Sequence, residues 1–214
     1  MNVFTLDVGS RSRLEELTKL LRNALDQIYE RRRENSAVVL RCESTAASSF
    51  VDESIQNISA WEKALRQLEV SQAIIIFMSN GDAFGHAFDL LLISDFRIVG
   101  RDSKIGFGLQ NSLIRPGMSL YRLANQIGQA RSRQVGLTGR AFSAEESCSL
   151  GLADEIADNG NDLLSPLLKK LDDLPSSELA LRRRLLLEAH AMDYDNALGA
   201  HLAACARGHP GSCE

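Results

Sequence analysis

The sequence predicts an α/β protein built around a mainly parallel β-sheet. Two stretches, AVVLRC at 37–42 and AIIIFM at 73–78, are nearly continuous in apolar residues, which is typical of strands buried on both faces of a sheet. Segments with the apolar spacing of amphipathic helices alternate with these strands. This alternation favours βαβ units and therefore parallel pairing.

The N-terminal part supplies the first units of this pattern. VFTLDV at 3–8 alternates apolar and polar residues and predicts a strand. Ser12 and Glu15 form a capping-box pattern that predicts the start of a helix. The apolar face of this helix consists of Leu14, Leu17, Leu21, Leu25 and Ile28. A second helix is expected before the strand at 73–78, with Ile55, Ile58, Ala60, Trp61, Leu65 and Leu68 at helical spacing.

Short strands and helices are expected between the middle of the chain and residue 160. The expected strands are FRIVG at 96–100, KIGFG at 104–108 and LADEI at 152–156. The expected helices run from Pro116-Gly117 to about Gly128, from Gln129 to about Leu137, and from the capping box SAEE at 143–146 to Gly151. These elements continue the α/β pattern.

The C-terminal part is helical throughout. Three amphipathic segments, LLSPLLKKL, ELALRRRLLLEAHAM and DNALGAHLAACAR, are separated by breaks at Pro175 and Asp193. The sequence has no internal repeat and no low-complexity linker. We therefore expect a core domain over 1–160 and a helical region over 161–214 that packs on the core or on neighbouring subunits.

Composition excludes several classes of function. The chain has 214 residues, 44% of them hydrophobic and 24% charged, with a net charge of −4, as in a globular protein without a basic surface for nucleic acid. The apolar runs are far shorter than the roughly 20 residues that span a bilayer. The start MNVFTLDVGSR lacks the order of a signal peptide, so a cytoplasmic location is expected. The scattered cysteines and histidines show no metal-ligand spacing, and no metal is expected.

The stretch NGDAFGHAFDLLLISD at 80–95 directly follows the strand at 73–78. It predicts a glycine-containing turn that leads from a buried strand into a helix. The first N–H groups of a helix have no acceptor within the helix and attract anions and developing oxyanions. The simpler alternative is close packing of the backbone at Gly81 and Gly85.

This stretch resembles the core segment of the crotonase, or enoyl-CoA hydratase/isomerase, superfamily. The family pattern there is roughly NG-x-A-x-GGG-x-E-L-A-x-x-C-D. The likeness continues in KIG at 104–106, RPG at 115–117 and LTGR at 137–140, and then in SAEE at 143–146 and GLA at 151–153. Residues 36–54 fit more loosely, and the resemblance covers about 36–157. It implies a crotonase-like spiral of ββα units with a helical C-terminal extension, in a homotrimer or hexamer that binds acyl-CoA thioesters.

The resemblance also implies roles for single residues. Two backbone N–H groups, those of Val51 and His86, would hold the thioester oxygen as an enolate forms. Asp89 falls at the place of the first carboxylate of the hydratases, and Leu109 at the place of the second. Gly85, Leu109 and Gly117 would contact substrate. No cofactor is implied beyond the coenzyme A of the substrate.

Departures from the family pattern limit the chemistry. Leu109 cannot transfer a proton, so hydration by two carboxylates is not expected. Chemistry with one acid or base remains: dehydration, decarboxylation or double-bond migration. The side chain of His86 replaces a glycine and has either a role beside the oxyanion or a structural one. Asp82 is expected to stabilise its own turn, and Asp95, at the place of a family aspartate, to be structural.

Within the superfamily, the short length and the segment DNALGAHLAACAR most resemble one subgroup. Its members are the small hydratase-like proteins that work with a type III polyketide synthase in forming dihydroxyphenylacetyl-CoA, a precursor of dihydroxyphenylglycine in glycopeptide antibiotics. This resemblance implies dehydration of a β-hydroxyacyl-CoA or cyclised polyketide-CoA. The alternatives are a non-catalytic subunit that binds acyl-CoA or assists the synthase, and an isomerase or decarboxylase.

Overall fold

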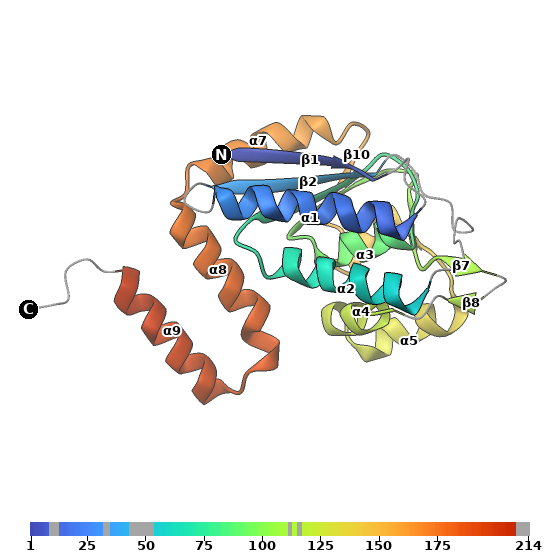
Figure 1. Ribbon diagram of the computed structural model, residues 1–214. Helices are drawn as coiled ribbons and strands as arrows, with labels where there is room; N and C mark the ends of the chain where they lie inside the picture. The colour runs from blue at the N-terminus through green and yellow to red at the C-terminus, as the bar shows by residue number, and fades with distance from the viewer. Residues whose placement is uncertain (9–12, 32–34, 43–53, 111–112, 115–116, 209–214) are drawn as a thin grey trace, which may run out of the picture.

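The computed structural model describes residues 1–8, 13–31, 35–42, 54–110, 113–114 and 117–208. In this part of the chain, the main sheet has the strand order β1-β2-β3-β5-β10, and every neighbouring pair is parallel (Figure 1). Its strands are β1 (Asn2–Asp7), β2 (Ser36–Cys42), β3 (Ile74–Ser79), β5 (Phe96–Gly100) and β10 (Glu155–Ala157). The predicted α/β class with a parallel sheet is confirmed.

The central strands bury both of their faces. Val38 of β2 is in register with Ile75 of β3, and both belong to an apolar cluster beneath the N-terminal helices. Their neighbours Val39 and Ile76 point to the opposite face and belong to a second cluster. This two-sided burial explains why these strands are nearly continuous in apolar residues.

Helices cover both faces of the main sheet. The helices α1 (Leu14–Glu30), α2 (Ile55–Glu69) and α3 (His86–Ile93) contribute to the larger cluster (Figure 1). On the other face, α7 (Asn161–Asp172) contributes Leu164 and Leu171 to the smaller cluster. The N-cap expected at Ser12 differs from the structure by one residue, because Arg13 is the N-cap of α1 and its side chain makes no capping hydrogen bond. Ser12 itself lies outside the described residues.

Smaller elements lie beyond the main sheet. The short strands are β4 (Ala83–Phe84), β6 (Lys104–Gly106) and β9 (Phe142–Ser143), which pair together, and β7 (Leu109–Gln110) with β8 (Leu113–Ile114). The helices are α4 (Ser119–Ile127), α5 (Gln129–Thr138) and α6 (Ala144–Ser149). The capping box at Ser143 is confirmed, with both of its hydrogen bonds present. The strand expected over 104–108 is too long, since β6 ends at Gly106, and the strand expected over 152–156 begins only at Glu155.

The C-terminal helices extend from the sheet as α8 (Ser176–Glu188) and α9 (Tyr194–Gly208), separated by the short 3₁₀ helix η1 (Ala189–Ala191) (Figure 1). Pro175 is the N-cap of α8, and Asp193 accepts the backbone N–H of Asn196 at 2.9 Å, so the predicted breaks are confirmed. The side chain of Arg183 fastens α8 to the core. It donates to Oδ2 of Asp95 at 2.6 Å. It also donates to the backbone carbonyl oxygens of Glu69, the last residue of α2, and of Ser71.

The division at residue 160 stays a prediction. Among the described residues, no helix combines the length and the apolar character needed to cross a bilayer.

Candidate active site

The site begins at the glycine turn between β3 and α3. Gly85 has a φ of 59°, a left-handed conformation that favours glycine, and is the N-cap of α3. Its N–H donates to the carbonyl oxygen of Gly106 in β6 at 3.3 Å. Asp82 accepts the backbone N–H of Lys104 at 2.8 Å. The turn is therefore fixed against β6, and Asp82 links the two segments. Its expected role within its own turn stays a prediction.

His86 is the first residue of α3. Backbone N–H groups in the first turn of a helix point outward along its axis, where they can meet an anion or a developing oxyanion. The imidazole ring packs edge-on against the indole of Trp61 in α2, with 5.5 Å between ring centroids. Its side chain is only 11% exposed.

Asp89 lies three residues after His86, still in the first turn of α3, and is almost completely buried, with 2% of its surface exposed. Its Oδ2 accepts a hydrogen bond from Nε1 of Trp61 at 3.0 Å. Its Oδ1 accepts a hydrogen bond from the hydroxyl group of Ser119, the first residue of α4. Nδ1 of His86 lies 3.9 Å from Oδ2, an ion-pair distance rather than a hydrogen-bond distance. Both carboxylate oxygens thus have donors from other helices.

These neighbours decide the charge of Asp89. Burial raises the pKa of the carboxyl group, but His86, Ser119 and Trp61 together lower it further, so the net pKa lies below its ordinary value. His86 is the largest of the lowering influences. Asp89 is therefore an ionised carboxylate at neutral pH, able to accept a proton.

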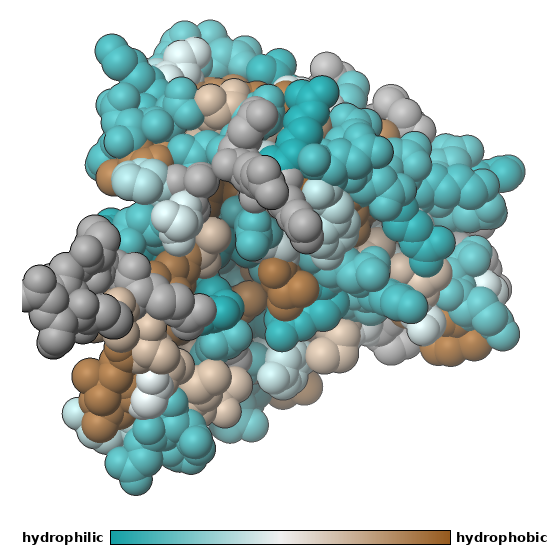
Figure 2. Space-filling view, turned by 60° about the vertical axis from the view of Figure 1, so that its left-hand side comes forward, coloured by the Kyte–Doolittle hydropathy of each residue, from teal (hydrophilic) through white to brown (hydrophobic). Residues whose placement is uncertain are grey.

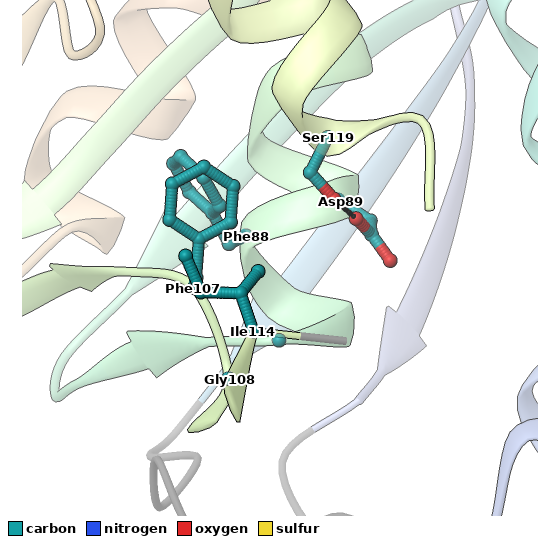
Figure 3. A pocket seen from close by; sticks show the side chains of 7 residues that line it. Phe88, Asp89, Phe107, Gly108, Ile114 and Ser119 are labelled. Atoms are coloured by element: carbon teal, nitrogen blue, oxygen red, sulfur yellow. Dashed lines mark hydrogen bonds between the residues drawn. The ribbon is translucent and has the colours of Figure 1, made fainter. Parts of the chain in front are cut away.

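A small pocket opens beside this carboxylate (Figure 3). Its cavity volume is about 10 Å³, which is about the space of one water molecule. Among the described residues, its lining consists of Gly85, Phe88, Asp89, Phe107, Gly108, Ile114 and Ser119. The rings of Phe88 and Phe107 meet edge to face at 5.2 Å. The pocket therefore joins an apolar wall to one carboxylate and one hydroxyl group.

The other expected site residues are distributed as follows. Leu109, in β7, is not among the described lining residues. Its side chain faces Gly139, so that a Cβ added at Gly139 would lie 3.0 Å from Cδ2 of Leu109. Gly117 lies near Glu62 of α2 and is also absent from the described lining. Val51, expected to provide an oxyanion N–H, lies outside the described residues. The structure thus brings Gly85, His86 and Asp89 together.

Trp61 and Ser119 are site residues that the sequence did not single out as such. Trp61 stood out only as an apolar position at helical spacing, and Ser119 as a residue in an expected helix. Nothing in their own segments indicates a contact with Asp89, which depends on how α2, α3 and α4 pack. Among the described residues, no group of three or more His, Cys, Asp or Glu side chains could hold a metal ion.

The fold as a whole matches solved enoyl-CoA hydratase structures. One from Shewanella pealeana superposes with a TM-score of 0.84 over 99% of this chain and 86% of that one, at 16% identity. An enoyl-CoA hydratase/isomerase from Marinobacter aquaeolei gives 0.78 over 97% and 89%, at 20% identity. The fold and the site define an α/β protein of the crotonase-like class, with a glycine turn leading to a buried carboxylate.

Sequence comparison gives the family. Residues 43–207 match the model of the Enoyl-CoA hydratase/isomerase family, and the chain belongs to this family. A protein of Amycolatopsis orientalis named "Enoyl-CoA-hydratase" is 35% identical over 150 residues, which are 70% of this chain and 69% of that protein. An "Enoyl-CoA isomerase/hydratase" of Zymoseptoria tritici is 40% identical over 75 residues, and the aligned part spans 35% of this chain and only 24% of that relative.

Proposed function

We propose that this protein acts on acyl-CoA thioesters and dehydrates a β-hydroxyacyl-CoA or a cyclised polyketide-CoA. The observation that carries the proposal is the combination of a helix N-terminus at His86 with one ionised, buried carboxylate, Asp89, beside the pocket. In this proposal the N–H groups of His86 and Val51 hold the thioester oxygen as the enolate forms. Such preorganised donors, at about 3 Å from the oxyanion, contribute a few kcal/mol to the transition state.

The reaction is proposed to be dehydration because one proton-transferring group suffices for it. Asp89 takes the proton α to the thioester, and the same proton can then leave with the β-hydroxyl group as water. Leu109, at the place of the second carboxylate of the hydratases, cannot transfer a proton, so the two-carboxylate addition of water is not available. The direction of the single-carboxylate reaction is then set by the relative stability of substrate and product. The proposed substrate is therefore one whose α proton is already acidic and whose product is stabilised, such as a cyclised polyketide that becomes aromatic.

We place the protein beside a type III polyketide synthase, in forming dihydroxyphenylacetyl-CoA. The support is the sequence resemblance to the small hydratase-like proteins of that pathway, together with the loss of the second carboxylate. The reaction uses no cofactor beyond the coenzyme A of the substrate. The proposal includes a cytoplasmic location, which fractionation of the producing cells would test.

The test is to mix the purified protein with the synthase and to follow the thioester products by mass spectrometry. Dehydration predicts a product lighter by one water, formed many times over by substoichiometric protein. Loss of carbon dioxide would instead indicate a decarboxylase, and an isomer of unchanged mass would indicate an isomerase. Asp89→Asn is the matched control, and its mixture should resemble the synthase alone.

A non-catalytic subunit is the second candidate. It is favoured by Leu109 and by the donors that already occupy both oxygens of Asp89. Such a subunit would bind the acyl-CoA or the synthase and protect a reactive intermediate. It predicts that the yield of thioester product rises only until one molecule of this protein is present per synthase. The same rise should be seen with Asp89→Asn.

We further propose that the chain assembles as a homotrimer or hexamer through its C-terminal helices. Apolar side chains are exposed on the C-terminal helices α8 and α9, as Figure 2 shows at the lower left. They are Leu186 at 77%, Tyr194 at 79%, Leu198 at 42% and Leu202 at 60%. Exposed apolar patches of this kind mark association surfaces. Sedimentation should give three or six chains for the wild type and fewer for Leu202→Glu, whereas a monomer at all concentrations contradicts the proposal.

A further inference from the structure

The two donors to Asp89 differ in what they can do. The indole N–H of Trp61 can only donate a hydrogen bond, whereas the hydroxyl group of Ser119 can donate or accept one. Oδ2, which faces Trp61, therefore stays an acceptor toward the indole in every state of the site, a bond that favours the bare oxygen. Oδ1, which faces Ser119, can be a bare carboxylate oxygen or carry a proton, because the hydroxyl group can turn to suit either form.

We propose that Trp61 and Ser119 are positioning residues that make Oδ1 of Asp89 the single proton-exchanging atom of the site. This inference rests on the proposed function and specifies how one carboxylate carries it out. Asp89 and Ser119 both line the pocket, on the side where Figure 3 shows the two side chains meeting. The indole of Trp61, which is fully buried, holds the other oxygen away from exchange.

The proposed step balances as follows. Oδ1 takes the α proton of the thioester, and the electron pair of the broken C–H bond passes to the thioester oxygen as the enolate forms. The hydroxyl group of Ser119 then turns from donor to acceptor of the new O–H group. When the enolate collapses, the β-carbon–oxygen bond breaks, and the proton on Oδ1 leaves with the hydroxyl group as water. Asp89 is again a carboxylate, and Ser119 donates to it as before.

The positions of the two donors are set independently of Asp89. Glu62, the residue after Trp61, accepts the backbone N–H of Met118 at 3.1 Å and a hydrogen bond from Arg122 at 2.8 Å. Met118 directly precedes Ser119. This bridge fastens α2 to the start of α4, so Trp61 and Ser119 approach Asp89 from a preformed frame, as positioning to a fraction of an ångström requires.

Among the described residues, the charged groups on the elements around Asp89 are the following. On α3 the neighbouring titratable group is His86, at 3.9 Å. On α2 and α4 they are Glu62 and Arg122, which pair with each other at 2.8 Å. The strands β3 and β4, which also contact α3, contain no charged residue. Loss of one neutral donor therefore changes the titration of Asp89 through the lost hydrogen bond itself.

The experiment compares Ser119→Ala, Ser119→Thr and Trp61→Phe by two readouts. The first is the titration of Asp89 in the free protein, followed by carboxyl-carbon NMR. The second is the pH profile of kcat in the synthase-coupled assay. Ser119→Ala and Trp61→Phe should both raise the pKa of Asp89, because each removes a donor to the ionised form.

In Ser119→Ala the acidic limb of the kcat profile should move to higher pH, and kcat should fall about tenfold or more with a smaller change in KM. Ser119→Thr keeps the hydroxyl group and should restore both values toward those of the wild type. The matched control is Ser147→Ala. It removes another buried serine hydroxyl, which donates to the carbonyl oxygen of Ser143 at 2.8 Å, and should change neither readout.

Equal titration of Asp89 in the wild type, Ser119→Ala and Trp61→Phe would overturn the inference. A shifted titration with an unchanged kcat profile would also overturn it, because Ser119 would then have no part in proton exchange. A shifted titration in a protein whose wild type turns over no thioester would instead reject the proposed function and leave the two hydrogen-bond assignments standing. The NMR readout needs no substrate, so these failures are distinguishable.

Discussion

The indole N–H of Trp61 donates to Oδ2 of Asp89 at 3.0 Å, although the two residues are 28 positions apart in the chain. Trp61 is fully buried, and its ring also meets the imidazole of His86 edge-on. A helix that precedes the glycine turn therefore fixes both polar side chains of the first turn of α3. The geometry of the site depends on the packing of α2 as much as on the turn itself.

Asp89→Asn should abolish most of the turnover. The amide keeps the shape of the side chain but cannot accept a proton, and general acid–base groups contribute about 10²–10⁴-fold to rate. The measurement is kcat with the synthase-derived thioester, with the folded state checked by circular dichroism. An Asp89→Asn protein with the turnover of the wild type would show that the proton acceptor has been assigned wrongly.

Glu62→Gln should reduce kcat by roughly tenfold, because weakening the bridge between α2 and α4 misplaces the donors to Asp89. The variant retains an oxygen for the N–H of Met118 but loses the charge that pairs with Arg122. Glu69→Gln is the matched control, since Glu69 lies 3.9 Å from the same guanidinium group of Arg122 and accepts its closer hydrogen bond, at 2.8 Å, from Arg66 of its own helix. Equal rates in the two variants would argue against the bridge.

Arg183→Met should destabilise the protein by roughly 2 kcal/mol, because it removes the buried guanidinium group that donates a charge-assisted hydrogen bond to Oδ2 of Asp95. The guanidinium group also donates to the carbonyl oxygens of Glu69 and Ser71. Urea unfolding gives the free energy. The neighbour Arg182 is exposed and pairs along its own helix with Glu178, so Arg182→Met should change stability by no more than about 0.5 kcal/mol. A similar small effect in Arg183→Met would show that the attachment of α8 through Arg183 contributes little to the free energy of unfolding.

Crotonyl-CoA should be hydrated far more slowly than the median enzyme turnover of about 10 s⁻¹. The hydratases use a second carboxylate for fast addition of water to such a simple substrate, and Leu109 stands at its expected place. The loss of enoyl absorbance measures the rate directly. Hydration at ordinary enzyme rates would contradict the importance given to Leu109 and would favour a common hydratase.

The sequence predicts most of the main sheet because its strands carry strong local signals. The strand expected over 96–100 agrees with β5, and the apolar run at 73–78 differs from β3 by one residue at each end. The two-residue strands β4, β7, β8 and β9 were not predicted, since pairs such as Ala83–Phe84 are too short for periodicity to show. β4 and β9 depend on pairing with β6, which is distant in the chain, whereas β7 and β8 pair with each other.

The candidate site is predictable to a similar degree. The glycine turn, His86 and Asp89 lie within one continuous motif, which the sequence brings together by itself. Trp61 and Ser119 reach Asp89 only because α2 and α4 both pack on α3, and no local pattern reports such a contact. Glu62, whose carboxylate joins these two helices, stood in the sequence as an ordinary charged residue of a helix surface.

The most direct test of the account is to compare His86→Pro with His86→Ala. Proline is tolerated at the first position of a helix and removes the backbone N–H there, whereas alanine keeps the N–H and removes only the imidazole. If this N–H holds the oxyanion, kcat in His86→Pro should fall about 10²–10³-fold below that of His86→Ala. Equal kcat values in two folded variants would contradict the claim that the glycine turn presents this N–H to a thioester oxygen.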